Sequence, residues 1–162
     1  MMILLFSVDG DHYGINVCDV TEVLPSVTLK HFPHGPAYVA GLLNYRGEAV
    51  PVIDLTLLMS SNASRNRISS RIVLVGYPNE GGVHHLFGLL VEKITETVKI
   101  PDHTFARSGV IIDDAPFLGD IAIYGGAMVQ VVDIRKVLPD SVKAMLFCDF
   151  KESNVITSGM ER

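Results

Sequence analysis

The sequence has 162 residues, of which 48% are hydrophobic and 19% charged, and its formal net charge is −5. This length fits one domain of ordinary size or two very small lobes, and the apolar content is too high for a disordered chain. An acidic chain without a basic stripe is a poor candidate for binding nucleic acid or anionic lipid, so neither partner is expected.

The low cysteine content and the lack of a recognisable signal peptide indicate the cellular compartment. Two cysteines, Cys18 and Cys148, make neither a disulfide framework nor a metal knuckle. Cys18 falls within an apolar pattern and is predicted to be a small buried residue. The apolar stretch 1–8 is too short for a signal peptide, and no later stretch reaches membrane-spanning length. We therefore expect a soluble protein of the reducing cytoplasm that does not insert into a membrane.

The first half of the chain predicts short strands separated by turns. Strands are predicted over 3–8, around 13–15, over 41–45 and over 49–53. The spacing of Val17, Val20 and Leu24 is helical and predicts a helix, which ends at Pro25. Asp54 is placed to cap a short helix over 55–59.

The second half follows a solvated connector, rich in serine and arginine, over 60–71. A hairpin is predicted over 71–77 and 85–91, then a helical stretch, an irregular segment, and strands over 117–123 and 127–132. Asp133 is expected to cap a last short helix that ends at Pro139. The residues after Asp140 are predicted to add a helix or an edge strand, and those from about 151 to fray. Many short strands with short helices indicate mainly-β barrels.

A weak internal duplication organises the chain. Residues 13–22 align with 87–96, and 45–54 align with 124–133, at offsets of 74 between Tyr13 and Phe87 and 79 between Asp54 and Asp133. The second copy therefore has about five extra residues, and two small copies packed together form a more stable unit than one.

Differences between the copies point to function. The first copy has Asn44 and Arg46 where the second has Ile123 and Gly125. An arginine on a hairpin turn presents a planar fork of donors suited to a partner's carboxylates or carbonyls. The alternative is that Arg46 ties down a neighbouring loop through a buried salt bridge.

The first half also contains a recognisable series of residues: Phe6, Tyr13-Gly14-Ile15, Val17, Val20, Glu22-Val23-Leu24, Pro36, Gly41-Leu42-Leu43-Asn44-Tyr45-Arg46-Gly47 and Val50-Pro51-Val52-Ile53-Asp54-Leu55. In these residues the chain resembles the CheW family of bacterial chemotaxis coupling proteins. The resemblance implies two pseudo-symmetric five-stranded SH3-like β-barrel lobes with a hydrophobic core between them. It also implies a scaffold, without enzymatic activity, that joins the cytoplasmic tips of methyl-accepting receptors to the regulatory domain of a CheA-type histidine kinase.

The resemblance also places the domains and the binding residues. We expect a domain over 1–139 that is followed by a partly disordered extension over 140–162. Within the domain, the first lobe is expected over about 13–60 and the second over about 72–139, and the strand 3–8 completes the fold. The expected receptor- and kinase-binding residues are Val20, Glu22, Gly41, Asn44, Arg46, Gly47, Ile72 and Ile94. By their spacing, Val20, Ile72 and Ile94 are equally ordinary core candidates, and Gly41 is an ordinary residue at the start of a strand.

Some segments depart from the family pattern. Glu92-Lys93, the segment 109–119 and the connector are atypical. They leave open an auxiliary adaptor of a separate chemosensory pathway, such as a surface-sensing one.

No catalytic, metal-binding or cofactor-binding motif is found. His31 and His34 are separated by a proline and have no accompanying cysteine or carboxylate cluster, and no nucleophile elbow or phosphate-binding glycine loop occurs. Arg65, Arg67 and Arg71 could contact phosphate or an acidic partner, although a solvated loop accounts for them as well. The alternatives are a small-molecule-sensing barrel, which requires an apolar pocket, and an unrecognised enzyme.

Overall fold

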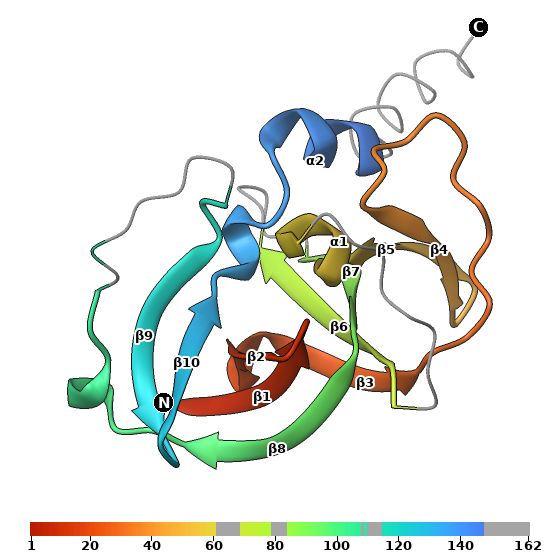
Figure 1. The fold of residues 1–162 in the computed structure, drawn as a ribbon. Helices are drawn as coiled ribbons and strands as arrows, with labels where there is room; N and C mark the ends of the chain where they lie inside the picture. The colour runs from red at the N-terminus through yellow and green to blue at the C-terminus, as the bar shows by residue number, and fades with distance from the viewer. Residues whose placement is uncertain (61–68, 79–83, 108, 110–114, 148–162) are drawn as a thin grey trace, which may run out of the picture.

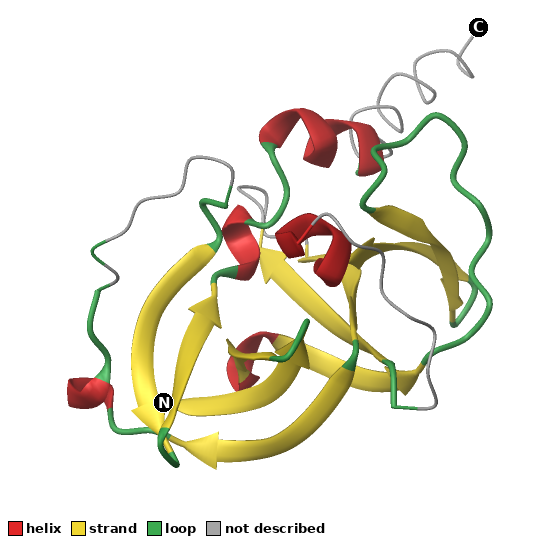
Figure 2. Ribbon diagram, in the orientation of Figure 1, coloured by secondary structure: helices red, strands yellow, loops and turns green. Residues whose placement is uncertain are grey.

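A computed structural model describes residues 1–60, 69–78, 84–107, 109 and 115–147. The described strands are β1 (Met2–Val8), β2 (Asp11–Asn16), β3 (Val20–Pro25), β4 (Val39–Tyr45), β5 (Glu48–Asp54), β6 (Arg71–Pro78), β7 (His84–Val91), β8 (Lys93–Lys99), β9 (Leu118–Tyr124) and β10 (Ala127–Val132). The helices are short, as Figure 2 shows: α1 (Leu55–Ser60), α2 (Asp140–Leu146) and the 3₁₀ turns η1 (Val17–Asp19), η2 (Asp102–Thr104) and η3 (Ile134–Lys136). The chain is mainly β, as predicted.

The strands form two five-stranded sheets that each draw on both halves of the sequence. Sheet A has the order β8-β1-β2-β10-β9, and sheet B has the order β3-β6-β7-β5-β4. Sheet A lies on the left of Figure 1 and sheet B on the right. If β1 to β5 are renamed β6 to β10, and β6 to β10 are renamed β1 to β5, the strand order of sheet A becomes that of sheet B. The two sheets therefore have the same arrangement, with equivalent strands taken from opposite halves of the chain. The predicted pair of five-stranded lobes is thus confirmed, but the lobe ranges 13–60 and 72–139 do not coincide with the sheets.

Strand register supports the duplication. Gly14 in β2 lies opposite Val131, and Gly88 in β7 lies opposite Val52, which are the partners that the two sequence offsets require. Strand β3 shifts its register between Val20 and Glu22, and β8 shifts between Ile94 and Glu96. Both β-bulges therefore fall at the threonine of the aligned Thr-Glu pair.

The core has one central part and two smaller ones. A central cluster draws buried side chains from both sheets, such as Phe6 and Phe87, and from the turn before β9, where Phe117 lies; residues of α1 and α2 also contribute to it. Each sheet also encloses a cluster of its own, around Ile3 in sheet A and Ile72 in sheet B. Successive residues of β1 and β6 alternate between the central cluster and their sheet's own cluster, so these strands are buried on both faces.

Two helices predicted from the sequence are wrong. The segment with helical spacing forms η1 and then the strand β3, because the backbone of residues 20–25 pairs with β6. The stretch after Val91 forms β8, which pairs with β1. Cys18 is exposed rather than buried, since it lies in the short turn η1 and not on a helix face.

The two predicted helix caps, Asp54 and Asp133, are confirmed. The Asp54 carboxylate accepts a hydrogen bond from the Leu57 amide at 3.1 Å and caps α1, and Asp133 accepts one from the Arg135 amide at 3.1 Å at the start of η3. The segment after residue 139 forms α2, whose Val142 is buried in the central cluster. Most of the connector, and the residues predicted to fray, lie outside the described residues.

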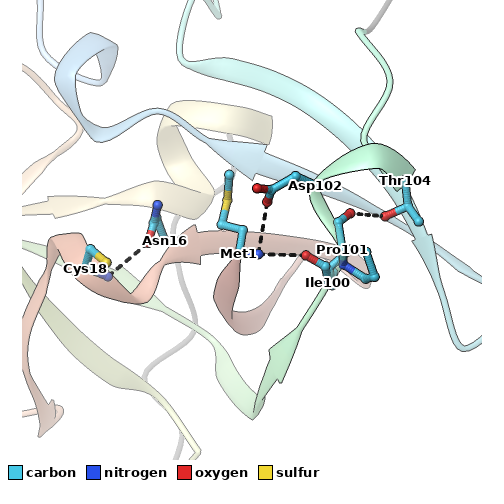
Figure 3. A network of polar contacts seen from close by, with 7 residues as sticks. All are labelled: Met1, Asn16, Cys18, Ile100, Pro101, Asp102 and Thr104. Carbon is cyan, nitrogen blue, oxygen red and sulfur yellow. Dashed lines mark hydrogen bonds and ion pairs between the residues drawn. The ribbon is translucent and has the colours of Figure 1, made fainter.

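The start of β1 is held by polar contacts that Figure 3 shows. The Met1 amine lies 2.8 Å from the Ile100 carbonyl and 3.0 Å from the Asp102 carboxylate. These contacts join β1 to the segment after β8. None of the helices in the described residues combines the length and the apolar character that crossing a membrane requires.

Candidate docking site

The turn between β4 and β5 is strained in a way that its counterpart is not. The two strands are joined by Arg46 and Gly47, whose φ angles are 52° and 83°, and β9 and β10 by Gly125 and Gly126, whose φ angles are 58° and 79°. Such two-residue turns need positive φ at both positions and favour glycine there. An arginine at φ 52° costs about 1–2 kcal/mol. The fold accepts glycine at this position in the second copy, so the arginine is not needed to form the turn.

The side chains around this turn form a polar cluster, which we name the Glu22–Tyr45–Arg46 cluster. The Tyr45 hydroxyl donates a hydrogen bond of 2.5 Å to the Glu22 carboxylate. The Arg46 guanidinium lies 3.9 Å from the same carboxylate oxygen and 5.1 Å from the centre of the Tyr45 ring. Glu22 belongs to β3 and Tyr45 to β4, the two edge strands of sheet B. The cluster therefore joins the two edges of this sheet.

Exposure within the cluster leaves Arg46 accessible to a partner. The Arg46 side chain is 80% exposed and that of Glu22 is 39% exposed. The alternative of a buried salt bridge is thus excluded, and an exposed ion pair at this distance contributes little to stability. Most of the guanidinium donors face solvent, while Glu22 and the tyrosine ring restrain the side chain.

The hydrogen bond between Tyr45 and Glu22 also changes the pKa of Tyr45. It raises the pKa of the Tyr45 phenol above its ordinary value of about 10, because the neutral phenol donates to the Glu22 carboxylate and the phenolate does not.

A groove lies between edge strands of the two sheets. It has a volume of about 410 Å³ and is lined by Val23 of β3, Ser69, Arg71 of β6, and Lys93 and Ile94 of β8. We name it the inter-sheet groove. Its apolar and basic lining residues come from segments of both sheets, so it exists only when the two sheets pack together.

A second shallow groove runs beside the strained turn. It has a volume of about 380 Å³ and is lined by Thr28, Lys30, Leu42, Leu43, Asn44, Gly47, Glu48 and Ala49. Two of its lining residues, Lys30 and Leu42, pair with each other through two backbone hydrogen bonds.

The structure brings four of the predicted binding residues together. Glu22 and Arg46 belong to the cluster, and the Asn44 side-chain carbonyl accepts a hydrogen bond of 3.0 Å from the Gly47 amide, which stabilises the turn.

The other four predicted residues lie apart from the cluster. Val20 is half-buried against the central core, and Gly41 lies so close to the chain at Lys30 that a Cβ atom would be 2.6 Å from the Lys30 carbonyl oxygen. Ile94 lines the inter-sheet groove. Ile72 is completely buried, because β6 is an inner strand whose Ile72 covers Gly88, and it therefore presents no surface to a partner.

Sequence reasoning missed one residue of the Glu22–Tyr45–Arg46 cluster and one of the inter-sheet groove. Tyr45 was overlooked because the second copy also has a tyrosine there, Tyr124, which made it resemble architecture. Lys93 of the groove was noted only as a departure from the family pattern. Because the groove joins strands that are distant in sequence, no local signal revealed it.

Among the described residues, no group of three or more His, Cys, Asp or Glu side chains could hold a metal ion. The space within each sheet is filled by completely buried aliphatic side chains such as Ile3, Ile72 and Leu74. Both grooves are open surface features. Both therefore offer open surface to a protein partner.

Comparison with known proteins agrees with this geometry. The family model described as the CheW-like domain matches residues 2–142. This chain belongs to the CheW-like domain family. It is 23% identical over 139 residues to the chemotaxis protein CheW of Rhizobium meliloti (strain 1021), covering 85% of this chain and 86% of that protein. It is 20% identical over 145 residues to CheW of Klebsiella aerogenes, covering 88% and 84%.

A solved structure shows the same fold. The crystal structure of the scaffolding protein TtCheW from Thermoanaerobacter tengcongensis matches with a TM-score of 0.76 and 27% identity, over 88% of this chain and 90% of that one. CheW-like proteins are adaptors of bacterial chemotaxis and not enzymes, and this chain is a member of that class.

Proposed function

We propose that this protein is a cytoplasmic coupling protein, located at membrane receptor arrays, that joins a methyl-accepting chemoreceptor to a CheA-type histidine kinase. The domain over 1–139 carries this function. One surface adds to the homologous regulatory domain of the kinase, and another receives the helical hairpin of the receptor. The receptor-facing surface is formed by the Glu22–Tyr45–Arg46 cluster with Asn44 and Gly47.

The observation that carries the proposal is the exposed arginine on a turn that favours glycine. Arg46 has a positive φ although the second copy forms the same turn with Gly125. Backbone strain of this kind is a pointer to function when the fold does not require the residue. A largely exposed guanidinium, held by Glu22 and Tyr45, is well prepared to bind a partner's carboxylates or carbonyls in a fixed orientation.

The experiment is co-purification of the tagged full chain from its own cells, with partners identified by mass spectrometry. We expect a chemoreceptor and a CheA-type kinase with the wild-type chain. Arg46→Ala should lose most of the receptor while retaining a cooperative thermal transition, and Arg107→Ala, an exposed arginine outside the cluster, should behave as wild type. The receptors recovered also decide whether the chain serves motility or an auxiliary pathway such as surface sensing.

Two outcomes would overturn the proposal. One is a wild-type chain that recovers neither a receptor nor a kinase. The other is equal recovery of receptor by wild type and Arg46→Ala, which would remove the cluster from the docking surface. Loss of the cooperative transition in Arg46→Ala would show that the arginine acts in folding.

A further inference from the structure

The hairpin of β9 and β10 carries the two most exposed large apolar side chains among the described residues. Ile123 is 71% exposed and Met128 is 63% exposed, and they lie directly opposite each other on the paired strands. Residues in such cross-strand positions point to the same face of a sheet and form one surface, which we name the Ile123–Met128 pair. Single exposed apolar residues are ordinary, but adjoining ones form a patch that gains free energy when a partner covers it.

The fold does not require large apolar residues at these positions. In the aligned copies, Ile123 corresponds to Asn44, and Met128 corresponds to Ala49. Asn44 and Ala49 also lie opposite each other, so the two hairpins are equivalent in register as well as in sequence. Since the first copy forms the same hairpin with a polar and a small residue, the Ile123–Met128 pair is a property of the surface rather than of the architecture.

The same hairpin is free of charged residues. Residues 121–132 include no charged side chain, whereas the equivalent residues 42–53 include Arg46 and Glu48. The whole chain has a net charge of −5, so two copies repel each other where their acidic surfaces meet. The hairpin is therefore a place where a second copy can approach with little repulsion.

The backbone of β9 has an unpaired edge beside Ile123. Strand β9 is an edge strand of sheet A, and Ile121 exchanges two backbone hydrogen bonds, of 2.9 Å and 2.8 Å, with Ala106 on its outer side. Because the backbone groups of alternate residues point to the same side of a strand, the N–H and C=O of Ile123 also point outward. Before Ala106 the chain forms η2, whose amides bond within that turn, so no described residue pairs with these outward groups.

The edge at residues 121–124 lacks the usual protection against pairing with another chain. Charged residues, proline or a β-bulge protect most edge strands in this way. Residues 121–124 are Ile-Ala-Ile-Tyr, which favour a strand and include neither a charge nor a proline. The register shift of this hairpin lies at its other end, between Gln130 and Val132. The edge beside Ile123 can therefore accept a further strand.

A second copy of the same strand fits all of these features. Two identical strands can pair antiparallel about a twofold axis, and the N–H and C=O of Ile123 in each copy then bond to Ile123 in the other. On one face, the side chains of Met128 and Ile123 from one copy continue into Ile123 and Met128 of the other as a single apolar row. A Cβ atom on Gly125 or Gly126 would have no other residue within 4 Å apart from the adjacent ones, so the turn leaves room for the partner.

We propose that the β9–β10 hairpin is a self-association site, at which two copies of this chain pair along β9 and join their sheets A into one continuous sheet. The contact is small, and the loss of translational and rotational freedom offsets most of its free energy. The dimer is therefore weak, with a dissociation constant of about 10 µM to 1 mM. This site goes beyond the proposed coupling function, whose Glu22–Tyr45–Arg46 cluster belongs to sheet B.

Sedimentation equilibrium of the full chain, at concentrations from about 5 µM to 1 mM, measures the association. We expect the average mass to rise from that of a monomer towards that of a dimer. In a mixture of isotope-labelled and unlabelled chain, NMR detects contacts between the copies. These contacts should place Ala122 of one copy beside Tyr124 of the other, as antiparallel pairing centred on Ile123 requires.

Variants separate this contact from folding. Ile123→Asn combined with Met128→Ala introduces the residues of the first copy, so it should keep the cooperative thermal transition and raise the dissociation constant about tenfold or more. Ile123→Lys introduces a charge of the kind that protects natural edge strands and should abolish the dimer. Val27→Asn changes an exposed apolar residue outside the hairpin and should leave the dissociation constant unchanged.

Three results would overturn the inference: a chain that stays monomeric up to about 1 mM, an Ile123→Lys variant that dimerises as wild type does, or contacts between copies that involve other segments. The two proposals fail separately. Dimerisation is measured on the purified chain without receptor or kinase, so its absence leaves the coupling function standing. A chain that recovers no receptor but pairs through β9 refutes the coupling function alone.

Discussion

Replacing Arg46 by glycine copies the turn of the second repeat into the first and separates folding from docking. The substitution removes the strain of a non-glycine residue at φ 52°, which is worth about 1–2 kcal/mol. It also gives the unfolded chain more freedom, which lowers stability by about 0.4–1 kcal/mol. The lost contacts with Glu22 and Tyr45 are small because the arginine is 80% exposed, about 0.5 kcal/mol each at most.

These terms nearly cancel for glycine but not for alanine. Arg46→Gly should keep the free energy of unfolding within about 1 kcal/mol of wild type. Arg46→Ala keeps the strained backbone and loses the same contacts, so it should fall below the glycine variant by about 0.5–1 kcal/mol. Both variants should lose receptor coupling to the same extent, because both lack the guanidinium.

Urea denaturation of the three proteins measures the difference, with unchanged m-values as the check on two-state behaviour. Gly125→Ala is the matched control, since it introduces a side chain at φ 58° in the second copy and should lower stability by about 1 kcal/mol. If the alanine variant is as stable as the glycine variant, or if glycine destabilises by more than about 2 kcal/mol, the assignment of strain to this turn is refuted.

Three further changes have defined outcomes in the same denaturation assay. Gly88→Ala places a Cβ atom 2.8 Å from Ile72 Cγ2, so it should lower stability by about 1–3 kcal/mol, and adding Ile72→Leu, which lacks that methyl group, should restore part of the loss. Asp54→Ala removes the cap of α1 and should lower stability by about 1 kcal/mol, whereas Asp54→Asn should lose less. Because the hydrogen bond to Glu22 raises the folded-state pKa of Tyr45, its stabilisation is complete below pH 10 and disappears as the pH rises through that pKa; the stability advantage of wild type over Tyr45→Phe should shrink accordingly.

The parts of the fold with local signals were predictable. The turn at Asp9-Gly10 and the turn at Arg46-Gly47 each have glycine where positive φ is needed, and the caps at Asp54 and Asp133 precede helical turns. These features depend on residues only a few positions apart. The strands beside them were placed to within two residues for the same reason.

The helix predicted from Val17 to Leu24 fails for a nonlocal reason. Apolar residues at these spacings also fit a turn followed by a strand, and pairing with β6, whose Val73 lies 50 residues beyond Val23, decides between them. The exchange of strands between the halves has no local signature either, since the repeat indicates equivalent segments but not which copy they pair with.

Within the candidate site, too, some residues could be predicted from the sequence and others only from the structure. Arg46 was found because the copies differ there, and its exposure settles the earlier alternative of a buried salt bridge. Tyr45 and Lys93 required the structure: the first is shared by both copies in residue type but contacts Glu22 across the sheet, and the second acquires neighbours from the other sheet.

The exchange of strands has a consequence for how the protein is made. As the chain leaves the ribosome, β3, β4 and β5 emerge early, yet sheet B lacks β6 and β7, which lie between β3 and β5, until residue 91 has been synthesised. The hairpin of β1 and β2 waits longer, because its outer neighbours end at residues 99 and 132. Neither half of the gene encodes a sheet that is complete by itself, so the nascent chain must leave strand edges of sheet A unpaired until residue 132 has been synthesised. Cutting the gene at its repeat boundary would yield two fragments that fold only when mixed.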